Sequence, residues 1–153
     1  SGGKYLRAFG SKGKEPGSFT TCHGLAYDDR YEPPRLLVCD RDNRRLQHFT
    51  LEGEFLSLYG PELRRPCAAA IRGDIVALAE IEGAVALLDP EGNLVARIGD
   101  NPDQTQWANP KVALVDMLAG KYTTPHGLCW DNEGGLLVSE WNRAGRVVKM
   151  VQR

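Results

Sequence analysis

No stretch of this 153-residue sequence is hydrophobic for long enough to cross a membrane, and no charge of one sign dominates it. A membrane span needs about 18 apolar residues in a row, and residues 1–20 also lack the apolar core of a signal peptide. Nineteen Lys and Arg face 20 Asp and Glu, a formal net charge of −1. We therefore expect a soluble protein of unassigned compartment, with no nucleic-acid or membrane partner.

Cysteine is too sparse and too widely spaced for a disulfide framework or a zinc ribbon. The four cysteines stand singly in apolar or strand-like stretches, at Cys22, Cys39, Cys67 and Cys129. We predict that they are reduced thiols. Hydrophobic residues make up 42% of the chain and charged residues 25%, which is typical of one globular domain with its own core.

Helical periodicity is nearly missing as well, because the apolar residues alternate in short runs bounded by Gly, Pro, Asp and Asn. The pairs Glu52-Gly53 and Glu91-Gly92 suit tight hairpin turns, since Gly adopts a positive φ without strain. The sequence thus predicts an all-β fold. The predicted strands are 5–10, 24–28, 35–40, 45–50, 54–60, 68–72, 75–80, 84–89, 94–99, 127–131, 136–140 and 146–151.

A repeat organises these strands. "GSFTTCHGL" (17–25) returns as "GKYTTPHGL" (120–128), and strands aligned on these stretches recur in units of about 40 residues. Four short strands per unit are typical of β-propeller blades, which bury their faces only against neighbouring blades. We predict blades at 20–60, 64–100 and 122–153 in a single half-propeller domain, residues 1–153, with the last blade lacking its outer strand.

Residues 101–119 interrupt the repeat, in place of the short connection "GPELRRP" at 60–66. Val112, Val115 and Leu118 are spaced to form one face of a short helix. We expect this insertion to lie over one face of the ring, with Trp107 as an apolar cap and ligand-binding residue at the channel.

Two quoted stretches, "PHGLCWDNEGGLLVSEWNRAGRVVKM" and "HGLAYD…LLVCDRDNRRLQHF", resemble NHL-type propeller repeats, and the His together with Asp-Arg-X-Asn-X-Arg is similar to the propeller lyase domain of peptidylglycine alpha-amidating enzymes. The resemblance implies a six-bladed ring, zinc-binding histidines, and a channel arginine at Arg41. The chain departs from that family where an Asp follows the histidine, because Gly24 and Gly127 stand there. The family's catalytic tyrosine has no secure match, and Tyr27 on the inner strand is the nearest weak candidate.

Three blades cannot close a propeller ring of four to eight blades. The chain begins with an unmatched outer strand at 4–10 and ends after the third strand of a blade at 146–151. We therefore predict a homodimer that forms one six-bladed ring, in which residues 4–10 of each chain pair with residues 146–151 of the other.

One aligned column contains His23, Cys67 and His126, just before each inner strand. Inner strands line a propeller's channel, so these side chains are predicted to converge there and to bind a transition metal, zinc above all. Two arrangements stay open: four histidines of the dimer hold one ion on the two-fold axis, or each chain's His, Cys and His hold their own ion. The alternative is that the histidines only satisfy backbone groups.

A second column holds the carboxylates of Asp40, Glu80 and Glu140, at the end of each second strand. With Arg41, these residues are candidates for binding a cation, a substrate amine or another small-molecule or peptide ligand. The other reading is that they form turn and inter-blade hydrogen bonds. His48, on a third strand, is expected to be a solvated or inter-blade residue away from the axis.

Three function classes follow from these residues. The favoured one is a dimeric propeller that serves as a scaffold or binding module with a metal site in its channel. The alternatives are a zinc-dependent lyase of the peptidyl-hydroxyglycine type and a calcium-dependent, lactonase-like hydrolase that would use the carboxylate column.

Overall fold

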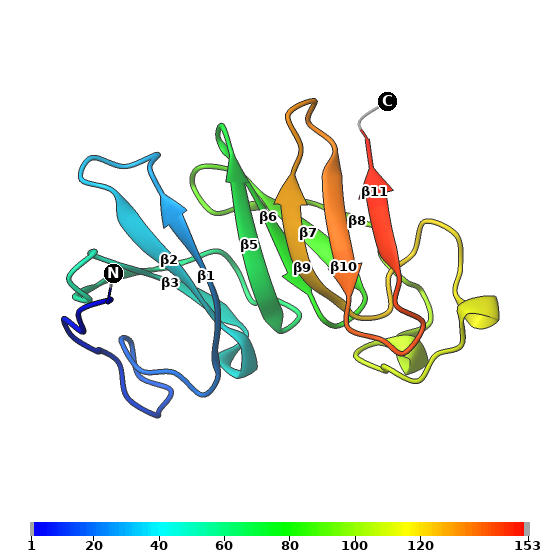
Figure 1. The fold of residues 1–153 in the computed structure, drawn as a ribbon, viewed down its shortest axis with the longest axis horizontal. Coiled ribbons are helices and arrows are strands. Elements are labelled where there is room, and N and C mark those ends of the chain that lie inside the picture. The colour runs from blue at the N-terminus through cyan, green and yellow to red at the C-terminus, as the bar shows by residue number, and fades with distance from the viewer. Residues whose placement is uncertain (1, 152–153) are drawn as a thin grey trace.

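The computed structural model describes residues 2–151 and contains three antiparallel sheets packed side by side (Figure 1). Blade 1 comprises β1 (Cys22–Asp28), β2 (Arg35–Asp40), β3 (Arg45–Phe49) and β4 (Phe55–Tyr59). Blade 2 comprises β5 (Pro66–Arg72), β6 (Ile75–Glu80), β7 (Ala84–Leu88) and β8 (Leu94–Ile98). Blade 3 comprises β9 (Pro125–Trp130), β10 (Leu136–Glu140) and β11 (Val147–Met150). The all-β prediction is confirmed.

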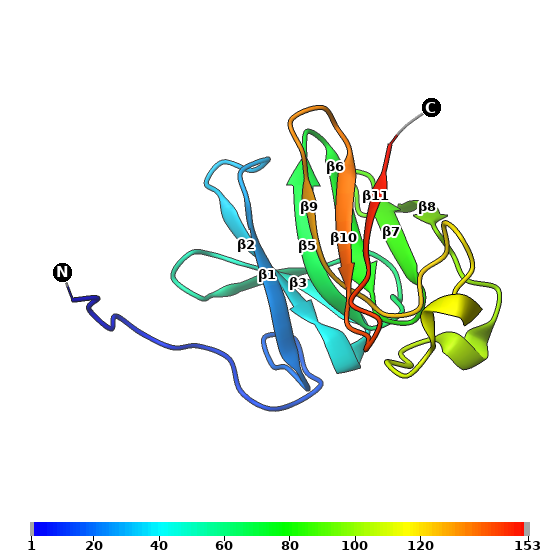
Figure 2. The same cartoon turned by 45° about the vertical axis from the view of Figure 1, so that its right-hand side comes forward.

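The strands of each sheet are paired in chain order, so that β1, β5 and β9 are the first strands of their sheets. These inner strands are neighbours in space, with β5 between β1 and β9 (Figure 1). The view turned by 45° shows the sheets one behind another, as consecutive blades of a propeller would stand (Figure 2). This arrangement brings the beginnings of the three inner strands together.

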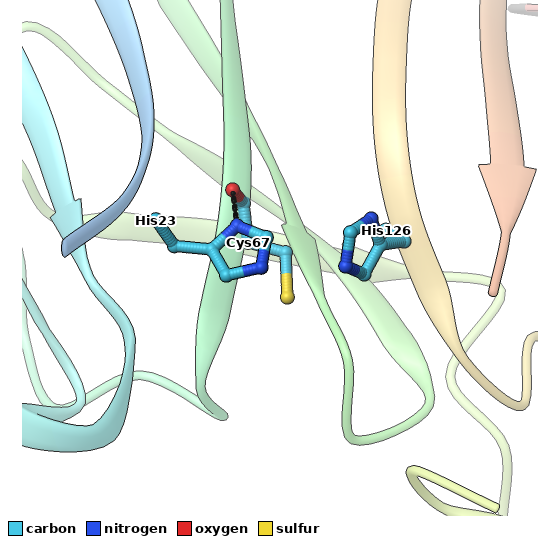
Figure 3. Close-up of side chains that lie close together, drawn as sticks. All are labelled: His23, Cys67 and His126. Carbon is cyan, nitrogen blue, oxygen red and sulfur yellow. Dashed lines mark hydrogen bonds between the residues drawn. The ribbon is translucent and has the colours of Figure 1, made fainter. Parts of the chain in front are cut away.

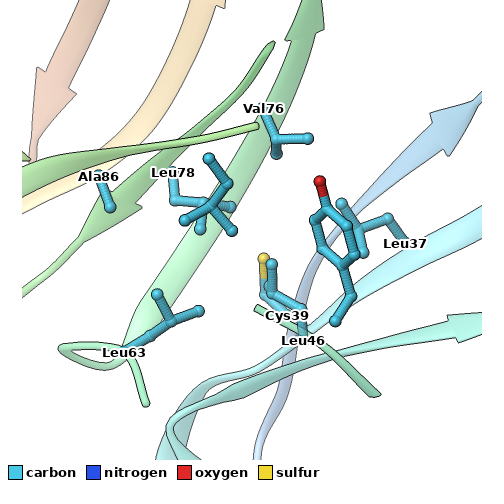
Figure 4. Close-up of a cluster of buried hydrophobic side chains, with 9 residues drawn as sticks. Leu37, Cys39, Leu46, Leu63, Val76, Leu78 and Ala86 are labelled. Atoms are coloured by element: carbon cyan, nitrogen blue, oxygen red, sulfur yellow. The ribbon is translucent and has the colours of Figure 1, made fainter. Parts of the chain in front are cut away.

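Two clusters of the hydrophobic core lie between neighbouring blades. One cluster joins blades 1 and 2, and Figure 4 shows its side chains converging from the two sheets. A second cluster joins blades 2 and 3 around Tyr122, Leu136 and Val138. Because β6 and β7 contribute to both clusters, blade 2 is covered by a neighbouring blade on each of its two faces. Blade 1 packs against a neighbouring blade on one face, and on its other face Val38 and Phe49 pack against Phe19. The first cluster consists of Leu37, Cys39, Leu46, Tyr59, Leu63, Val76, Leu78, Ala86 and Leu88.

The predicted first strand is not formed within the chain. Residues 2–11 are exposed and extended, without a partner strand among residues 2–151. Phe9 contacts Phe49 of blade 1, with ring centroids 5.3 Å apart. Pairing of residues 4–10 with a second chain remains a prediction. Likewise β11 has no partner on its outer side among the described residues, and residues 152–153 of the predicted third blade lie outside them.

The predicted helix in the insertion is wrong. Residues 101–119 contain two single turns of 3-10 helix, η2 (Gln104–Gln106) and η3 (Leu114–Asp116), besides η1 (Arg41–Asn43) in blade 1. Val112 is buried, but Val115 is 89% exposed, so the three predicted side chains do not share a buried face. A short helix with one packed side chain gains too few contacts to offset the cost of its nucleation. Within residues 2–151, no helix is long and apolar enough to span a membrane.

Candidate metal centre

The same backbone hydrogen bonds connect the entry of each inner strand to the end of the second strand in all three blades. Arg41 N donates to Thr21 O (3.0 Å) in blade 1. Ile81 N donates to Arg65 O (3.2 Å), and Trp141 N donates to Thr124 O (2.8 Å). His23, Cys67 and His126, here called the ligand column, each lie two residues after one of these acceptors. The repeated hydrogen bond therefore fixes the position of the ligand residue in every blade.

The ligand column converges on one point, as Figure 3 shows. The imidazole nitrogens of His23 and His126 and the Sγ of Cys67 provide three ligand atoms that all lie within 4.8 Å of one another. The two imidazole rings meet edge to face at 4.8 Å between centroids. The sequence places these residues 44 and 59 positions apart, and the packing of β1 and β9 against β5 brings them together.

Glycine is required beside the site for steric reasons. A Cβ on Gly24 would lie 2.3 Å from the carbonyl oxygen of Cys67, so only Gly allows β1 to approach β5 this closely. This contact explains why no Asp follows His23, in contrast to the amidating-enzyme pattern. At Gly127 on β9 the constraint is weaker, because a Cβ would meet only the rotatable Ser139 Oγ, at 2.8 Å.

A backbone contact orients the His23 ring. Its Nδ1 lies 2.8 Å from the carbonyl oxygen of Cys67, drawn as the dashed line in Figure 3. A carbonyl oxygen only accepts, so Nδ1 carries the proton and donates it. In this tautomer Nε2 carries no proton, so its lone pair is free to bind a metal ion.

The protonation states also suit a metal ion. Burial lowers the pKa of His126, and the neighbouring His23 and the positive charge of Arg41 act in the same direction, so its imidazole is neutral at pH 7. Burial raises the pKa of the Cys67 thiol, while Arg41 and Arg65 partly oppose this effect. Cys67 is therefore a thiol at neutral pH in the metal-free protein, and binding of a metal ion would release its proton.

The two weak catalytic candidates lie in different places. Arg41 adjoins the ligand column, since its charge acts on both Cys67 and His126, and its guanidinium also contacts Asp42 at 3.3 Å. Tyr27 lies four residues beyond His23 on β1, roughly 13 Å along an extended strand. Tyr27 therefore does not join the cluster at the strand entrance.

The carboxylate column (Asp40, Glu80, Glu140) is fully used by the scaffold. Asp40 Oδ1 accepts from Thr20 N, Glu80 Oε1 from Arg64 N, and Glu140 Oε1 from Thr123 N. Each carboxylate also pairs with an arginine of its own blade. These arginines are Arg45, Arg97 and Arg146.

All three carboxylate side chains are 0% exposed. This geometry favours the structural reading of the column over a calcium or ligand site, because the buried acceptor oxygens already have donors.

Trp107 does not cap the channel in the way predicted. Its ring packs on the backbone of Gly83, its Nε1 donates to Asn101 O (2.9 Å), and the Arg64 guanidinium lies over it at 4.3 Å. The insertion thus packs against blade 2. Trp141 is the indole at the site instead, with its ring centroid 6.2 Å from that of His126. Alignment of the blades could have identified Trp141, since it occupies the same repeat position as Arg41.

His48 is buried, which corrects the alternative of a solvated residue. Its Nε2 lies 3.0 Å from Asp28 Oδ2, and Arg30 pairs with the same carboxylate at 2.7 Å. Burial lowers the pKa of His48 despite that carboxylate, so the ring is neutral at pH 7. His48 therefore belongs to the scaffold and lies apart from the ligand column.

No protein-family model matches this chain. Among solved structures, it is similar to the selenomethionine-substituted virginiamycin B lyase from Staphylococcus aureus, with 11% identity and a TM-score of 0.53 over 84% of this chain and 40% of the other. A catalytically inactive variant of that lyase with quinupristin, in which Ala replaces a histidine, gives 12% identity and a TM-score of 0.54 over the same shares. A Bacteroides caccae protein of unknown function gives 15% identity and a TM-score of 0.58 over 82% of this chain and 44% of the other.

These likenesses establish the architecture as that of a propeller-type protein, with three blades within the chain. The chain spans about 40% of the length of the lyase structures that it matches. The lyase is a seven-bladed propeller-type protein, so the likeness supports stacked blades but not a six-bladed ring. Neither the NHL repeat nor the amidating-enzyme resemblance is supported by a match.

Proposed function

We propose that this propeller segment is a metal-binding module whose ligand column, His23, Cys67 and His126, holds one transition metal ion per chain. The observation that carries the proposal is the convergence of two imidazole nitrogens and one sulfur within 4.8 Å. Donor atoms bound to one tetrahedral zinc lie roughly 3.3–3.8 Å apart, given bond lengths of 2.0–2.3 Å, so small rotamer changes suffice to bind.

The donor set favours zinc. Imidazole and thiolate are ligands of borderline and soft metals, whereas calcium and magnesium require oxygen ligands. Three protein ligands leave a fourth position for water or a bound molecule. Because a single chain provides all three ligands, the arrangement with one ion per chain is favoured over four histidines sharing one ion on a two-fold axis.

Metal analysis of the purified protein tests this proposal. We expect about one zinc per chain after dialysis against a slight excess of zinc, and loss of that zinc in the double variant His23→Ala, His126→Ala. His48→Gln is the matched control, because His48 is remote from the ligand column, and it should keep the metal. Stoichiometric zinc in the double variant, or none in the unchanged protein, would refute the proposal.

We further propose that a second copy of the chain covers the open ends of the three-bladed unit. The inner strand of blade 1 exposes Leu25 (61%) and Tyr27 (56%) where a preceding blade would pack. At the other end, the outer edge of β11 is unpaired among residues 2–151, and Val147 is exposed. Unpaired edges and apolar faces of this kind are normally covered.

Sedimentation of the isolated chain tests this assembly. Two copies in head-to-tail contact would give six blades, and we expect a dimer whose thermal stability rises with protein concentration. A stable monomer of about 17 kDa would contradict the assembly without affecting the metal site.

A second candidate function is a zinc-dependent lyase of the peptidyl-hydroxyglycine type. Its support is the Arg41 guanidinium beside Cys67 and His126, at a metal site with an open position. Arg41 would bind an anionic group of the substrate, and zinc would supply a Lewis acid. Cleavage of a peptide ending in α-hydroxyglycine by the zinc-loaded protein, lost in Arg41→Gln but kept in Arg72→Gln, would support the lyase. No turnover above buffer would leave the binding module as the function.

A further inference from the structure

A pocket of about 290 Å³ lies beside Trp141, whose ring is near that of His126. Its lining residues are Pro110 of the insertion and Trp141, Asn142 and Arg143 of the turn between β10 and β11. Arg143 N donates to Pro110 O at 2.9 Å, which joins the insertion to blade 3 at this point. The pocket therefore has a wall that the other blades lack, because only blade 3 follows such an insertion.

Trp141 belongs both to this pocket and to the surroundings of the metal centre. Its indole is 56% exposed and lies 6.2 Å from the His126 ring, at an interplanar angle of 37°. An indole face that is half open to solvent can stack on a planar apolar group. A molecule lying on Trp141 would thus be next to a metal ligand.

The polar groups of the pocket include donors without acceptors and no acidic residue. Asn142 Oδ1 accepts from Gly145 N (3.1 Å), and its Nδ2 is buried away from the pocket, so the donors open to a ligand are those of Arg143. The guanidinium of Arg143 makes no hydrogen bond or ion pair within the same residues. Such a lining is complementary to a carboxylate, which a guanidinium binds with two parallel hydrogen bonds.

A larger cleft of about 680 Å³ provides a useful contrast. It lies at the opposite ends of β5 and β9 and also combines an indole, Trp130, with basic residues. There, however, Trp130 Nε1 donates to Ala70 O, and Lys149 pairs with Asp131 at 2.7 Å. Asp131 and Glu133 in its lining further oppose an anion.

We propose that Trp141 and Arg143 form the recognition subsite for the ligand of the metal centre, and that this ligand is an organic anion with a planar apolar group. The planar group stacks on Trp141 and the anionic group binds Arg143. The metal site is next to this subsite, because His126, whose ring is near Trp141, is one of its ligands. The second half of this proposal, presentation of the ligand to a metal, rests on the proposed function.

Calorimetric titration with 2-naphthoate tests the subsite, in zinc-loaded and in zinc-free protein. We expect saturable binding that weakens roughly tenfold or more in Trp141→Ala and in Arg143→Gln. Trp141→Phe, which keeps a planar ring, should stay within about threefold of the unchanged protein. Arg72→Gln, in the larger cleft, is the matched control and should bind normally.

Several results would overturn the subsite. These are no naphthoate binding to the unchanged protein, equal binding of the neutral 2-naphthalenemethanol, or a loss of binding in Arg72→Gln instead of Arg143→Gln. Zinc content, measured in the same samples, separates the two proposals. Trp141→Ala should keep its zinc, since Trp141 provides no ligand atom. If the protein takes up no zinc at all but binds naphthoate through Trp141 and Arg143, the subsite is supported and only the metal centre is refuted.

Discussion

The carboxylate column and the ligand column each place one polar side chain in every blade, within a few ångströms of the same strand entrance. In the first, each carboxylate is buried and has an arginine partner and a backbone donor. In the second, no side chain forms an ion pair with an arginine; His23 Nδ1 and Cys67 Sγ each contact one backbone carbonyl, and the three ligand atoms lie within 4.8 Å of one another. Repetition of a chemical group across blades therefore does not reveal its role, whereas the saturation of its hydrogen bonds does.

The largest change in the free energy of unfolding is expected when the carboxylate of blade 2, the blade that is covered on both faces, is replaced. Glu80→Gln leaves the Arg97 guanidinium, 19% exposed, without a counter-charge, and should lower the free energy of unfolding by about 3 kcal/mol. Urea denaturation of the metal-free protein measures this loss. The zinc affinity of the molecules that remain folded should be unchanged, and a parallel loss of both would contradict the separation of the columns.

A somewhat smaller effect is expected in the ligand column. Cys67→Ser should weaken zinc binding roughly 100-fold, about 2.7 kcal/mol, while the free energy of unfolding without metal changes by less than about 1 kcal/mol. Cobalt substitution provides the readout, because a thiolate ligand gives a sulfur-to-cobalt absorption band. The band should vanish in Cys67→Ser and persist in Cys22→Ser, a control at an exposed thiol. A band that survives in Cys67→Ser would show that the sulfur is not a ligand.

His48 sharpens the comparison, because it is a histidine used as scaffold. Its pKa in the folded protein lies below the value of about 6.5 in the unfolded chain, so on acidification the unfolded chain takes up the proton first. Its contribution to stability is thus complete above pH 6.5 and is lost as pH falls through the lower folded pKa.

Denaturation of the metal-free protein between pH 5 and 7 tests this assignment. The unchanged protein should become less stable toward pH 5, and His48→Gln should remove most of that slope. His126→Gln should remove less, because His126 is only half-buried. Equal slopes in His48→Gln and the unchanged protein would contradict the assignment.

The smallest effect is expected at a carboxylate outside both columns. Glu82 pairs with Arg44 at 2.8 Å, but the arginine side chain is 40% exposed, and partly exposed pairs contribute little. Glu82→Gln should therefore change the free energy of unfolding by less than about 1 kcal/mol in the same urea experiment. A loss as large as that of Glu80→Gln would mean that burial does not distinguish the two carboxylates.

Much of the fold follows from local sequence patterns. Eleven strands form near the predicted positions, because short alternating runs bounded by Gly and Asp specify strands and hairpins without reference to distant residues. The two exceptional segments depend on contacts with residues that are distant in the sequence. Residues 5–10 have a strand-like pattern but no neighbouring edge within the chain, and residues 112–118 have helical spacing but a packing surface for Val112 alone.

Sequence analysis could predict only those features of the site that recur at the same position in each repeat. Alignment of the blades identified the ligand column, although the convergence of its atoms depends on how closely β1 and β9 approach β5. The arginine partners of the carboxylates come from different strands, Arg45 at the start of β3 and Arg97 on β8, so no fixed spacing predicts them. The position of Trp107 in a long loop suggested a lid over the channel, whereas its ring packs on the backbone of Gly83.

The repeated bond from Arg41, Ile81 and Trp141 to the strand entrances has a consequence for how such a site can change. It is made by backbone atoms alone, so it holds whatever side chain is attached on either side. Successive blades can therefore acquire new residues at these positions independently, each substitution altering the chemistry at the strand entrances while the main chain stays in place. Evolution or design can treat the entrances as a set of separate positions: Cys67→His would give three imidazoles, and a charged residue at Ile81 would change which molecules bind there.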